Sequence, residues 1–440
     1  MMGALNEIRK RLSTPRRELE RKGLAKLKML INYLWDNSKY YRDLWKGSLG
    51  RKPEIKSLND ISNLPLVGHE LLQYHAKEAM AVKESDVALT FFSGGTAGLP
   101  KMVMWTKKDW YRRSFNRATL NYIRGIKPGD IALIALPFGT WGAGFSSQES
   151  LRLLNVTVIP FGFWWTGIKF LIKLMRSLSI TILVATPSLA LLIARYMEEN
   201  GESPPKTLRL IATTGEDVPP TTRNELKKFY NADVRAIYAA TESLVGVECS
   251  KERGYHFLPD DYIIEVVDPK TGEPVEKEEV GEIVITRLFG LAAPLVRYRL
   301  GDLVKVIEGS CDCGIDLPMI KFVGRTENTF VLTTGVNVFD YQIKEALSQS
   351  NIGINRYRII LLDDEKGFET VQFIGECENT SQMMIQKVYN ALSRLSIDFE
   401  DIISQGLVKL KVKLVPPGTL LVKSNSGKTL TIIDKRRYKK

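Results

Sequence analysis

The sequence predicts an α/β fold: a large N-terminal body with a parallel βα sheet plus an antiparallel β subdomain, then a small mobile α+β C-terminal domain. Three observations predict it. Short apolar runs ending in turn residues recur at roughly 25-residue intervals after residue 130, as in βαβ units. Near residue 254 the pattern changes to apolar runs separated by a tight turn, and it changes again after residue 330.

The first elements are helical and then alternate with strands. An N-terminal helix places apolar side chains on one face, namely Leu24, Leu27, Leu30, Ile31, Leu34 and Trp35. Continuous β-rich runs predict strands buried on both faces, at residues 131–137, 156–162, 181–188, 208–216 and 234–242. The residues between these runs have helical periodicity, as in 189–199, so we expect a parallel sheet covered by helices.

Antiparallel structure is expected next, because residues 262–275 predict a strand, an Asp-Pro-Lys-Thr-Gly turn and a second strand, followed by a strand in GEIVITRL. The last third predicts helices around 341–348 and 381–395 with strands at 356–362, 368–375 and 408–415. We therefore predict a body at 1–327 and a C-terminal lid domain at 328–440.

Bulk composition limits the protein class. With 440 residues, 44% of them hydrophobic and 25% charged, the chain can form two or three domains around a large core. Its longest apolar region, 168–184, carries three basic residues, whereas a bilayer span needs roughly 20 nearly uncharged residues. The first residues resemble neither a secretory signal nor a transit peptide, and four cysteines are too few for a secreted disulfide scaffold. We expect a cytoplasmic protein without a membrane partner.

The net charge of +12 is compatible with nucleic acid, an anionic membrane surface or small anionic ligands such as nucleotides. The basic residues are scattered along the chain and no nucleic-acid motif accompanies them. We therefore interpret most of this charge as a solvated surface and expect no nucleic-acid partner.

A glycine-rich segment at residues 92–101, FSGGTAGLPK, is the first candidate for chemistry. Its glycines let backbone N–H groups and two hydroxyls point inward together, an arrangement that suits phosphate oxygens. The glycines are Gly94, Gly95 and Gly98, and the hydroxyls belong to Ser93 and Thr96. It is no Walker A motif, because Leu99 and Pro100 precede Lys101. Taken alone, such a loop is also typical of a flexible connector.

Four further segments carry candidate residues. Tyr238-Ala-Ala-Thr-Glu242 and Thr213-Thr-Gly-Glu216 follow predicted parallel strands, where open α/β sheets bind ligands, although a Thr-Glu pair also caps helices. In Arg297–Asp302 a carboxylate beside a glycine turn can bind both ribose hydroxyls or form a simple salt bridge. Gly427-Lys428-Thr429 is not the end of a Walker A motif, because Val422 stands where the first glycine is needed.

Together and in this order, these segments resemble the adenylate-forming superfamily of acyl-CoA synthetases, most closely its phenylacetate-CoA ligase branch. FSGGTAGLPK is similar to the family's phosphate loop, YAATE to its Tyr-Gly-x-x-Glu stretch and RYRLGD to its ribose-binding segment. GRTENTFVLTTGVNVF is similar to its hinge, and PPGTLLVKSNSGKTLTIIDKR to its catalytic-lysine ending. The likeness extends from the helix at residue 24 to the last residues.

The resemblance implies roles position by position. It implies a catalytic set of Lys428, Glu242 and Thr96, in which Glu242 holds Mg²⁺ and Lys428 bridges the substrate carboxylate and the α-phosphate. It also implies a hinge at Asn328, about which the lid turns after adenylation. The residues that it implies for nucleotide binding are Ser93, Gly94, Gly95, Gly98, Lys101, Gly215, Glu216, Tyr238, Thr241, Asp302 and Arg325.

Two positions depart from the family pattern. Ala97 stands where a second Thr or Ser is common, so that one hydroxyl contact to phosphate is lost. Asn328 stands where the hinge usually has Asp. Neither change removes the chemistry, but both bear on rate and on hinge behaviour.

A second cluster offers metal ligands. Cys249, His256, Cys311 and Cys313 form a C-x6-H followed by C-x-C-G, which supplies the three thiolates and one imidazole of a closed structural Zn²⁺ site. Cys377 is left over. The alternative is unpaired core cysteines, but a Cys-x-Cys-Gly segment flanked by Pro and Gly is a poor core segment, so we predict zinc.

The sequence therefore predicts an ATP-dependent acid–thiol ligase that uses ATP, Mg²⁺ and coenzyme A, with a structural Zn²⁺. Aromatic residues at 137–145 and 161–165 are expected to line a pocket for an aryl or other apolar carboxylic acid. The nearest alternative is an adenylating enzyme that passes the acyl group to a carrier-protein thiol or an amine, as coenzyme F390 synthetase-like proteins do. A basic nucleic-acid-binding protein is the non-enzyme alternative, and a homodimer is compatible with the sequence.

Overall fold

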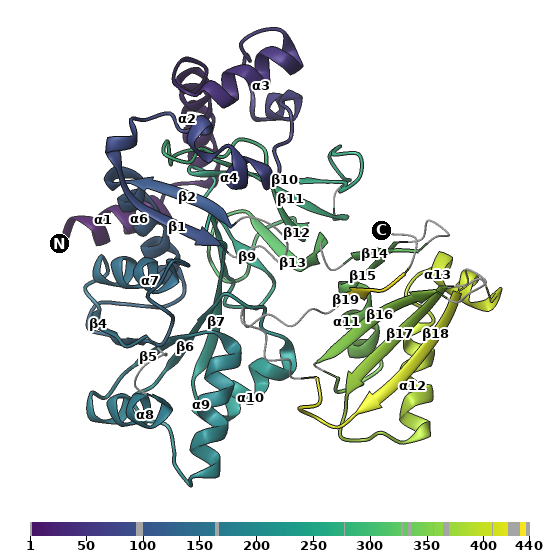
Figure 1. Ribbon diagram of the computed structural model, residues 1–440. Coiled ribbons are helices and arrows are strands. Elements are labelled where there is room, and N and C mark those ends of the chain that lie inside the picture. The colour runs from purple at the N-terminus through teal and green to yellow at the C-terminus, as the bar shows by residue number, and fades with distance from the viewer. Residues whose placement is uncertain are drawn as a thin grey trace. The chain divides into compact units, whose positions relative to one another are not determined.

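A computed structural model of the protein describes most of the chain (Figure 1). The described residues are 2–93, 100–162, 167–276, 278–326, 329–332, 337–354, 356–363, 369–406, 408–420 and 432–436. The chain divides into two compact units. The first comprises Met1–Leu300 and Val304–Phe322, and the second comprises Gly301–Leu303 and Val323–Lys440. The predicted movement of a lid about residue 328 stays a prediction.

Helices and one hairpin form the start of the first unit. The helices are α1 Met2–Leu12, α2 Arg16–Asn37, α3 Lys39–Leu49, α4 Glu70–Tyr74 and α5 Ala76–Ala79, with short 3₁₀ turns at Leu58–Asn63 and Glu84–Asp86. Helix α2 buries Leu27, Leu30, Ile31 and Leu34, the face that its periodicity predicts. Strands β1 (Val87–Ser93) and β2 (Lys101–Thr106) pair antiparallel, with Ser93 opposite Lys101.

Five parallel strands form one half of an eleven-stranded sheet in the described part of the chain. They are β3 Ile131–Ile134, β4 Thr157–Pro160, β5 Ile182–Ala185, β6 Leu210–Thr214 and β7 Asp233–Ala239. The first four lie within runs that the sequence predicts as strands, and β7 begins one residue before its run. The helices around them are α6 Lys107–Ile123, α7 Ala143–Arg152, α8 Gly167–Ser177, α9 Pro187–Glu199 and α10 Pro220–Tyr230.

Helices cover both faces of these parallel strands (Figure 1). Leu133 and Leu183 pack with α8, α9 and α10, whereas the neighbouring Ile134 and Val184 pack with α6 and α7. Successive side chains of a strand point to opposite faces, so strands covered on both sides need apolar residues at every position. This is why the strands read as continuous apolar runs.

The other half of the sheet is antiparallel where pairings are described. Its strands are β8 Leu244–Glu248, β9 Tyr255–His256, β10 Tyr262–Val267, β11 Val280–Arg287, β12 Tyr298–Ile307 and β13 Met319–Arg325. The strand order is β10-β11-β12-β13-β9-β8-β7-β6-β5-β3-β4. The second strand expected within 262–275 is wrong, since Pro274 forms only an isolated bridge with Val267; proline lacks the N–H that a longer ladder needs.

The second unit has its own sheet and core. Its elements are β14 Thr329–Val331, β15 Asn337–Phe339, α11 Asp340–Gln349, β16 Tyr357–Asp363, β17 Glu369–Glu376, α12 Gln382–Leu392, α13 Ile397–Ser404, β18 Val408–Val415 and β19 Ile432–Asp434. The sheet order is β18-β17-β16-β19. Phe373, Val388 and Phe399 lie fully buried in its core. The sequence pattern does not reveal α13 or the short strands β14, β15 and β19.

None of the described helices has the length and apolarity that a bilayer crossing requires.

Candidate active site

The turn between β7 and β8 presents a buried carboxylate at the carboxyl end of the parallel strands. Ala240 and Ser243 close this turn with mutual backbone hydrogen bonds, and the Glu242 side chain inside it is 2% exposed. Lys101, the first residue of β2, donates from Nζ to Glu242 Oε1 at 2.5 Å. Two residues predicted from separate motifs, 141 positions apart, are therefore in direct contact.

The Glu242 carboxylate is held in its charged form. Burial raises the pKa of this carboxyl, but the charge and hydrogen bond of Lys101, a backbone hydrogen bond and His69 together lower it by more. The net pKa lies below its usual value. An ionised carboxylate of this kind can bind a divalent cation, for which oxygen is the preferred ligand.

Two buried arginines hold the backbone of the same turn. Arg287 donates to the Glu242 carbonyl at 2.5 Å, and Arg113 donates to the Ala240 carbonyl at 3.4 Å. Both guanidinium groups lie over the Trp105 ring, at 4.3 and 5.4 Å from its centroid, in a cation–π arrangement. Sequence reasoning missed these three residues, because an arginine inside a helix or strand gives no local signal of a buried role.

Unsatisfied hydroxyls lie along this segment. The hydroxyl oxygens of Ser93, Thr241 and Ser243 are buried and have no hydrogen-bond partner among the described residues. Buried polar atoms are usually paired, so these three can bind a ligand. Ser93 and Lys101 are the described ends of the predicted phosphate loop. The loop residues Gly94, Gly95, Thr96, Ala97 and Gly98 lie outside the described residues.

Tyr238 is the second-to-last residue of β7 and its side chain is half buried. Its ring centroid lies 5.6 Å from that of Tyr255 and 5.5 Å from that of Phe322. These contacts fix the ring at the carboxyl end of the sheet, and its packing on an adenine stays a prediction.

The turn after β6 carries the predicted pair Gly215 and Glu216. Gly215 has φ +87°, and a Cβ there would lie 2.8 Å from the Trp141 ring, so only glycine fits. Glu216 accepts hydrogen bonds from the N–H and the hydroxyl of Ser188, at 3.1 and 2.6 Å. This carboxylate therefore caps the first turn of α9, a structural role that the sequence did not predict.

Asp302 and Arg325, both predicted to bind the nucleotide, meet in the second unit. Arg325 Nε donates to Asp302 Oδ1 at 2.8 Å, and the Asp302 side chain is 5% exposed. Thr326 fixes the adjacent backbone by donating to the Gly301 carbonyl at 2.9 Å. The predicted catalytic Lys428 and hinge residue Asn328 lie outside the described residues.

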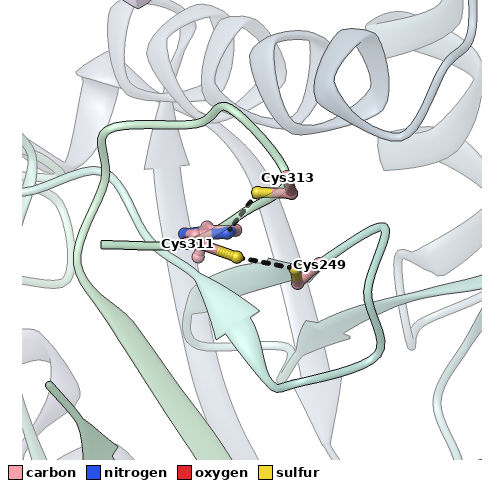
Figure 2. A group of neighbouring side chains, drawn as sticks. Cys249, Cys311 and Cys313 are labelled. Atoms are coloured by element: carbon pink, nitrogen blue, oxygen red, sulfur yellow. Dashed lines mark hydrogen bonds between the residues drawn. The ribbon is translucent and has the colours of Figure 1, made fainter. Parts of the chain in front are cut away.

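The four predicted metal ligands converge in the first unit, and Figure 2 labels the three cysteines among them. One ligand atom from each of Cys249, His256, Cys311 and Cys313 lies within 4.8 Å of all the others. Cys249 Sγ is 3.1 Å from Cys311 Sγ, and Cys313 Sγ is 3.2 Å from His256 Nε2. Spacings of this size fit four donors placed about 2.0–2.3 Å from a central Zn²⁺.

His256 is oriented for such a role. Its Nδ1 lies 3.0 Å from the Leu317 carbonyl, so that Nδ1 carries the proton and the Nε2 lone pair faces Cys313. Burial lowers the pKa of His256, which keeps the ring in the neutral form that binds metals. A ligand histidine whose other nitrogen donates to a carbonyl is the usual arrangement at zinc sites.

Aromatic side chains from the two segments predicted to line an acid pocket contact other rings, and the pocket itself stays a prediction. Phe145 lies 5.3 Å from Phe138 and 6.2 Å from Phe91 between ring centroids, and Phe91 lies 5.3 Å from Trp110. Phe145 remains 40% exposed, so this group of rings is not closed by its own packing. The second predicted segment contributes a contact of Phe161 with Phe170 at 6.1 Å, while residues 163–166 lie outside the described part.

Comparison with known proteins assigns the family. The AMP-binding enzyme family matches residues 28–289. The chain belongs to this family. Phenylacetate-coenzyme A ligase of Thermus thermophilus is 28% identical over 439 residues, 96% of this chain and 98% of that protein. The Pseudomonas putida enzyme of the same name is 27% identical over 429 residues, 94% of this chain and 93% of that protein.

Solved structures of AMP-binding enzymes show the same fold. The crystal structure of 2-hydroxyisobutyryl-CoA ligase with 2-HIB-AMP, in the postadenylation state, matches with a TM-score of 0.78 and 22% identity, covering 97% of this chain and 92% of that chain. This likeness confirms the predicted α/β architecture.

Proposed function

We propose that this AMP-binding enzyme is an acid–thiol ligase, which converts a carboxylic acid to an acyl-adenylate and transfers the acyl group to coenzyme A. The contact that carries the proposal is the buried Lys101–Glu242 pair, with Nζ and Oε1 2.5 Å apart. It brings the end of the predicted phosphate loop to the predicted Mg²⁺ ligand. The phenylacetate-coenzyme A ligases that match nearly the whole chain support the same reaction.

The reaction has two balanced steps. A carboxylate oxygen of the acid attacks the α-phosphorus of ATP, the bond to the bridging oxygen breaks, and pyrophosphate leaves. The thiol of coenzyme A then loses its proton to solvent and its sulfur attacks the acyl carbon, and AMP leaves as the thioester forms. In this proposal Lys428 stabilises the charge that develops at the α-phosphate in the first step, and Asp302 binds the ribose hydroxyls.

The residues around Glu242 fit Mg²⁺. Glu242 offers an ionised carboxylate, and the neighbouring Thr241 hydroxyl is buried and without a partner among the described residues. Mg²⁺ commonly binds one or two protein oxygens together with substrate phosphates. The ion would neutralise charge on the phosphates as pyrophosphate leaves, while Lys101 and Ser93 bind their oxygens.

The aromatic rings near Phe138 and Phe145 favour an aryl or other apolar acid. They offer apolar surface with edge-to-face geometry, the centroids of Phe138 and Phe145 lying 5.3 Å apart at 82°, and aromatic ligands favour such contacts. The cytoplasm, where thiols stay reduced, suits four cysteines without a disulfide partner among the described residues.

For the cysteine cluster we propose one structural Zn²⁺ per chain. The support is the donor set of three sulfurs and one imidazole nitrogen within 4.8 Å, which matches the four-coordinate ligands of closed sites. The ion would tie the segment after β8 to the segment before β13. Metal analysis of protein purified without chelators should give one equivalent of zinc, and Cys249→Ser should lower it. Absence of stoichiometric zinc would contradict this assignment.

The test of function is pyrophosphate exchange into ATP over a panel of aryl and aliphatic acids. We expect exchange that depends on one group of acids and AMP release that depends on coenzyme A. Lys428→Ala should abolish exchange while leaving the circular dichroism spectrum unchanged, and Lys435→Ala, an exposed lysine of the same unit, should retain activity. Exchange without coenzyme A-dependent AMP release would indicate a carrier-protein or amine acceptor, and no exchange with any acid would refute the proposal.

A further inference from the structure

A tyrosine and a histidine outside the predicted motif roles reach the Glu242 carboxylate. Tyr298, the first residue of β12, is fully buried, and its hydroxyl lies 3.5 Å from Glu242 Oε1. The same hydroxyl lies 2.9 Å from His69 Nδ1, at the start of α4. All three residues belong to the first unit, so Tyr298 connects Glu242 to a separate part of the same unit.

The direction of these hydrogen bonds follows from the donor inventory. An ionised carboxylate only accepts, and a tyrosine hydroxyl has a single O–H to donate. Tyr298 therefore donates to Glu242, and its oxygen accepts from His69, which must carry its proton on Nδ1. The three side chains form one ordered chain of hydrogen bonds, from His69 through Tyr298 to Glu242.

Lys101 and Tyr298 donate to the same oxygen, Glu242 Oε1, but the two donors differ in mobility. Lysine is a flexible point charge that also binds phosphate, and its side chain is 15% exposed. Tyr298 is fully buried and supported by His69. When nucleotide phosphates attract Lys101, Tyr298 is the donor that can stay on the carboxylate.

The backbone joins these segments without help from the tyrosine hydroxyl. Val67 donates to the Arg297 carbonyl at 2.9 Å, and Arg299 donates to the Val67 carbonyl at 2.8 Å. This isolated bridge between Val67 and Tyr298 keeps residues 67–69 beside Tyr298 even when the side chain at position 298 has no hydroxyl. The hydroxyl is thus not needed to connect the two segments, which leaves its contact with Glu242 to be explained.

We propose that Tyr298, supported by His69, is a positioning residue that holds the Glu242 carboxylate in the orientation that binds Mg²⁺ together with ATP. This inference rests on the proposed function, in which Glu242 is the Mg²⁺ ligand. It predicts that loss of one hydroxyl weakens the binding of the divalent ion while ATP can still bind.

The test compares Tyr298→Phe with a matched control. Tyr230→Phe removes a buried hydroxyl that donates to the Ala190 carbonyl at 2.8 Å, in the same unit but on α10. One readout is the dissociation constant of Mn²⁺ in the presence of ATP and in the absence of any acid, measured by electron paramagnetic resonance. The other is the Mg²⁺ concentration that gives half-maximal pyrophosphate exchange.

For Tyr298→Phe we expect the Mn²⁺ dissociation constant and the Mg²⁺ concentration for half-maximal exchange each to rise about tenfold, because a hydrogen bond to a charged group is worth at least about that factor. Tyr230→Phe should lower thermal stability and leave both values unchanged. His69→Asn, which keeps a donor near the Nδ1 position, should stay close to the wild type, whereas His69→Leu should resemble Tyr298→Phe.

Two outcomes separate the inference from the proposed function. If the wild-type protein exchanges pyrophosphate and Tyr298→Phe keeps wild-type Mn²⁺ and Mg²⁺ values, Tyr298 has no positioning role and the inference is refuted. If none of the acids supports pyrophosphate exchange by the wild-type protein, the proposed function fails. The Mn²⁺ measurement still decides whether Tyr298 acts on Glu242.

Discussion

Replacing Lys101 by methionine is expected to destabilise the first unit strongly, because it leaves a buried carboxylate without its cation. Lys101 Nζ lies 2.5 Å from Glu242 Oε1, and the two side chains are 15% and 2% exposed. Methionine has a similar length and no charge, so the substitution removes the ion pair with little change in packing.

Two estimates bound the loss in free energy of unfolding. At an effective dielectric constant of about 20, charges 2.5 Å apart attract by roughly 7 kcal/mol before desolvation is counted. Removing one partner of a buried pair costs about 3–5 kcal/mol. Tyr298 still donates to the carboxylate and the carboxyl group can take up a proton, so we expect the lower end, about 3 kcal/mol at pH 7.

The loss should depend on pH. In the wild type the pKa of Glu242 lies below its ordinary value of 4.5, so its charge stabilises the fold above that value and this stabilisation is lost as the pH falls through the folded pKa. In Lys101→Met the cation no longer opposes the effect of burial, and burial raises the pKa of Glu242. The charged form then costs stability as the pH rises above 4.5, and the difference between the proteins grows toward pH 7.

Urea unfolding followed by tryptophan fluorescence is the assay. All seven tryptophans lie at or before residue 165, within the first unit, so the signal reports that unit alone. Glu242→Gln and the double variant complete a double-mutant cycle. The double variant should be more stable than Lys101→Met, with a coupling energy of about 2 kcal/mol or more. A Lys101→Met protein within about 0.5 kcal/mol of the wild type, or a cycle without coupling, would refute the reasoning.

Three further predictions concern other parts of the first unit. Gly144→Ala would place a Cβ 2.7 Å from the Pro137 carbonyl oxygen and should cost about 1–3 kcal/mol in urea unfolding; Gly139→Ala, with nothing within 4 Å, is the control, and equal losses would count against the clash. Asp261, whose pKa is lowered to about 2 because Arg11, Arg112 and Lys26 outweigh its burial, should lose its stabilisation as the pH falls from about 4 to 2; Asp261→Asn should flatten that part of the urea midpoint profile, and an unchanged slope would contradict the assignment. Cys249→Ser should lower the melting temperature by more than Cys377→Ser, measured by calorimetry, since Cys377 lies outside the metal cluster; equal shifts would argue against a structural metal.

The sequence was sufficient for the type and order of most elements. Helix α2 and strands β3 to β7 follow from local side-chain patterns, because a helix buries one face at a spacing of three or four residues and a doubly covered strand is apolar at every position. The expected strand at Pro274 did not form, because the backbone N–H that proline lacks outweighed the β-propensity of its neighbours. The short strands β14, β15 and β19 were missed, since three residues are too few to show a period.

The site was predictable as a set of separate motifs. Lys101, Glu242, Asp302 and Arg325 were each named from their own segment, and the structure pairs them as Lys101–Glu242 and Asp302–Arg325. Arg113 and Arg287 were not predictable, because a guanidinium buried over an indole ring becomes visible only when distant segments are packed together.

What the sequence alone determined was the chemistry available at each position: a glycine-rich phosphate loop, a carboxylate after a parallel strand, and three thiols with one imidazole. Tertiary structure decided which of these groups meet. The order β13-β9-β8 brings Cys249 beside Cys311, 62 residues away, and backbone hydrogen bonds between residue 67 and residues 297 and 299 bring His69 to Tyr298. Contacts of this kind depend on strand order and long-range packing, which no local pattern of residues encodes.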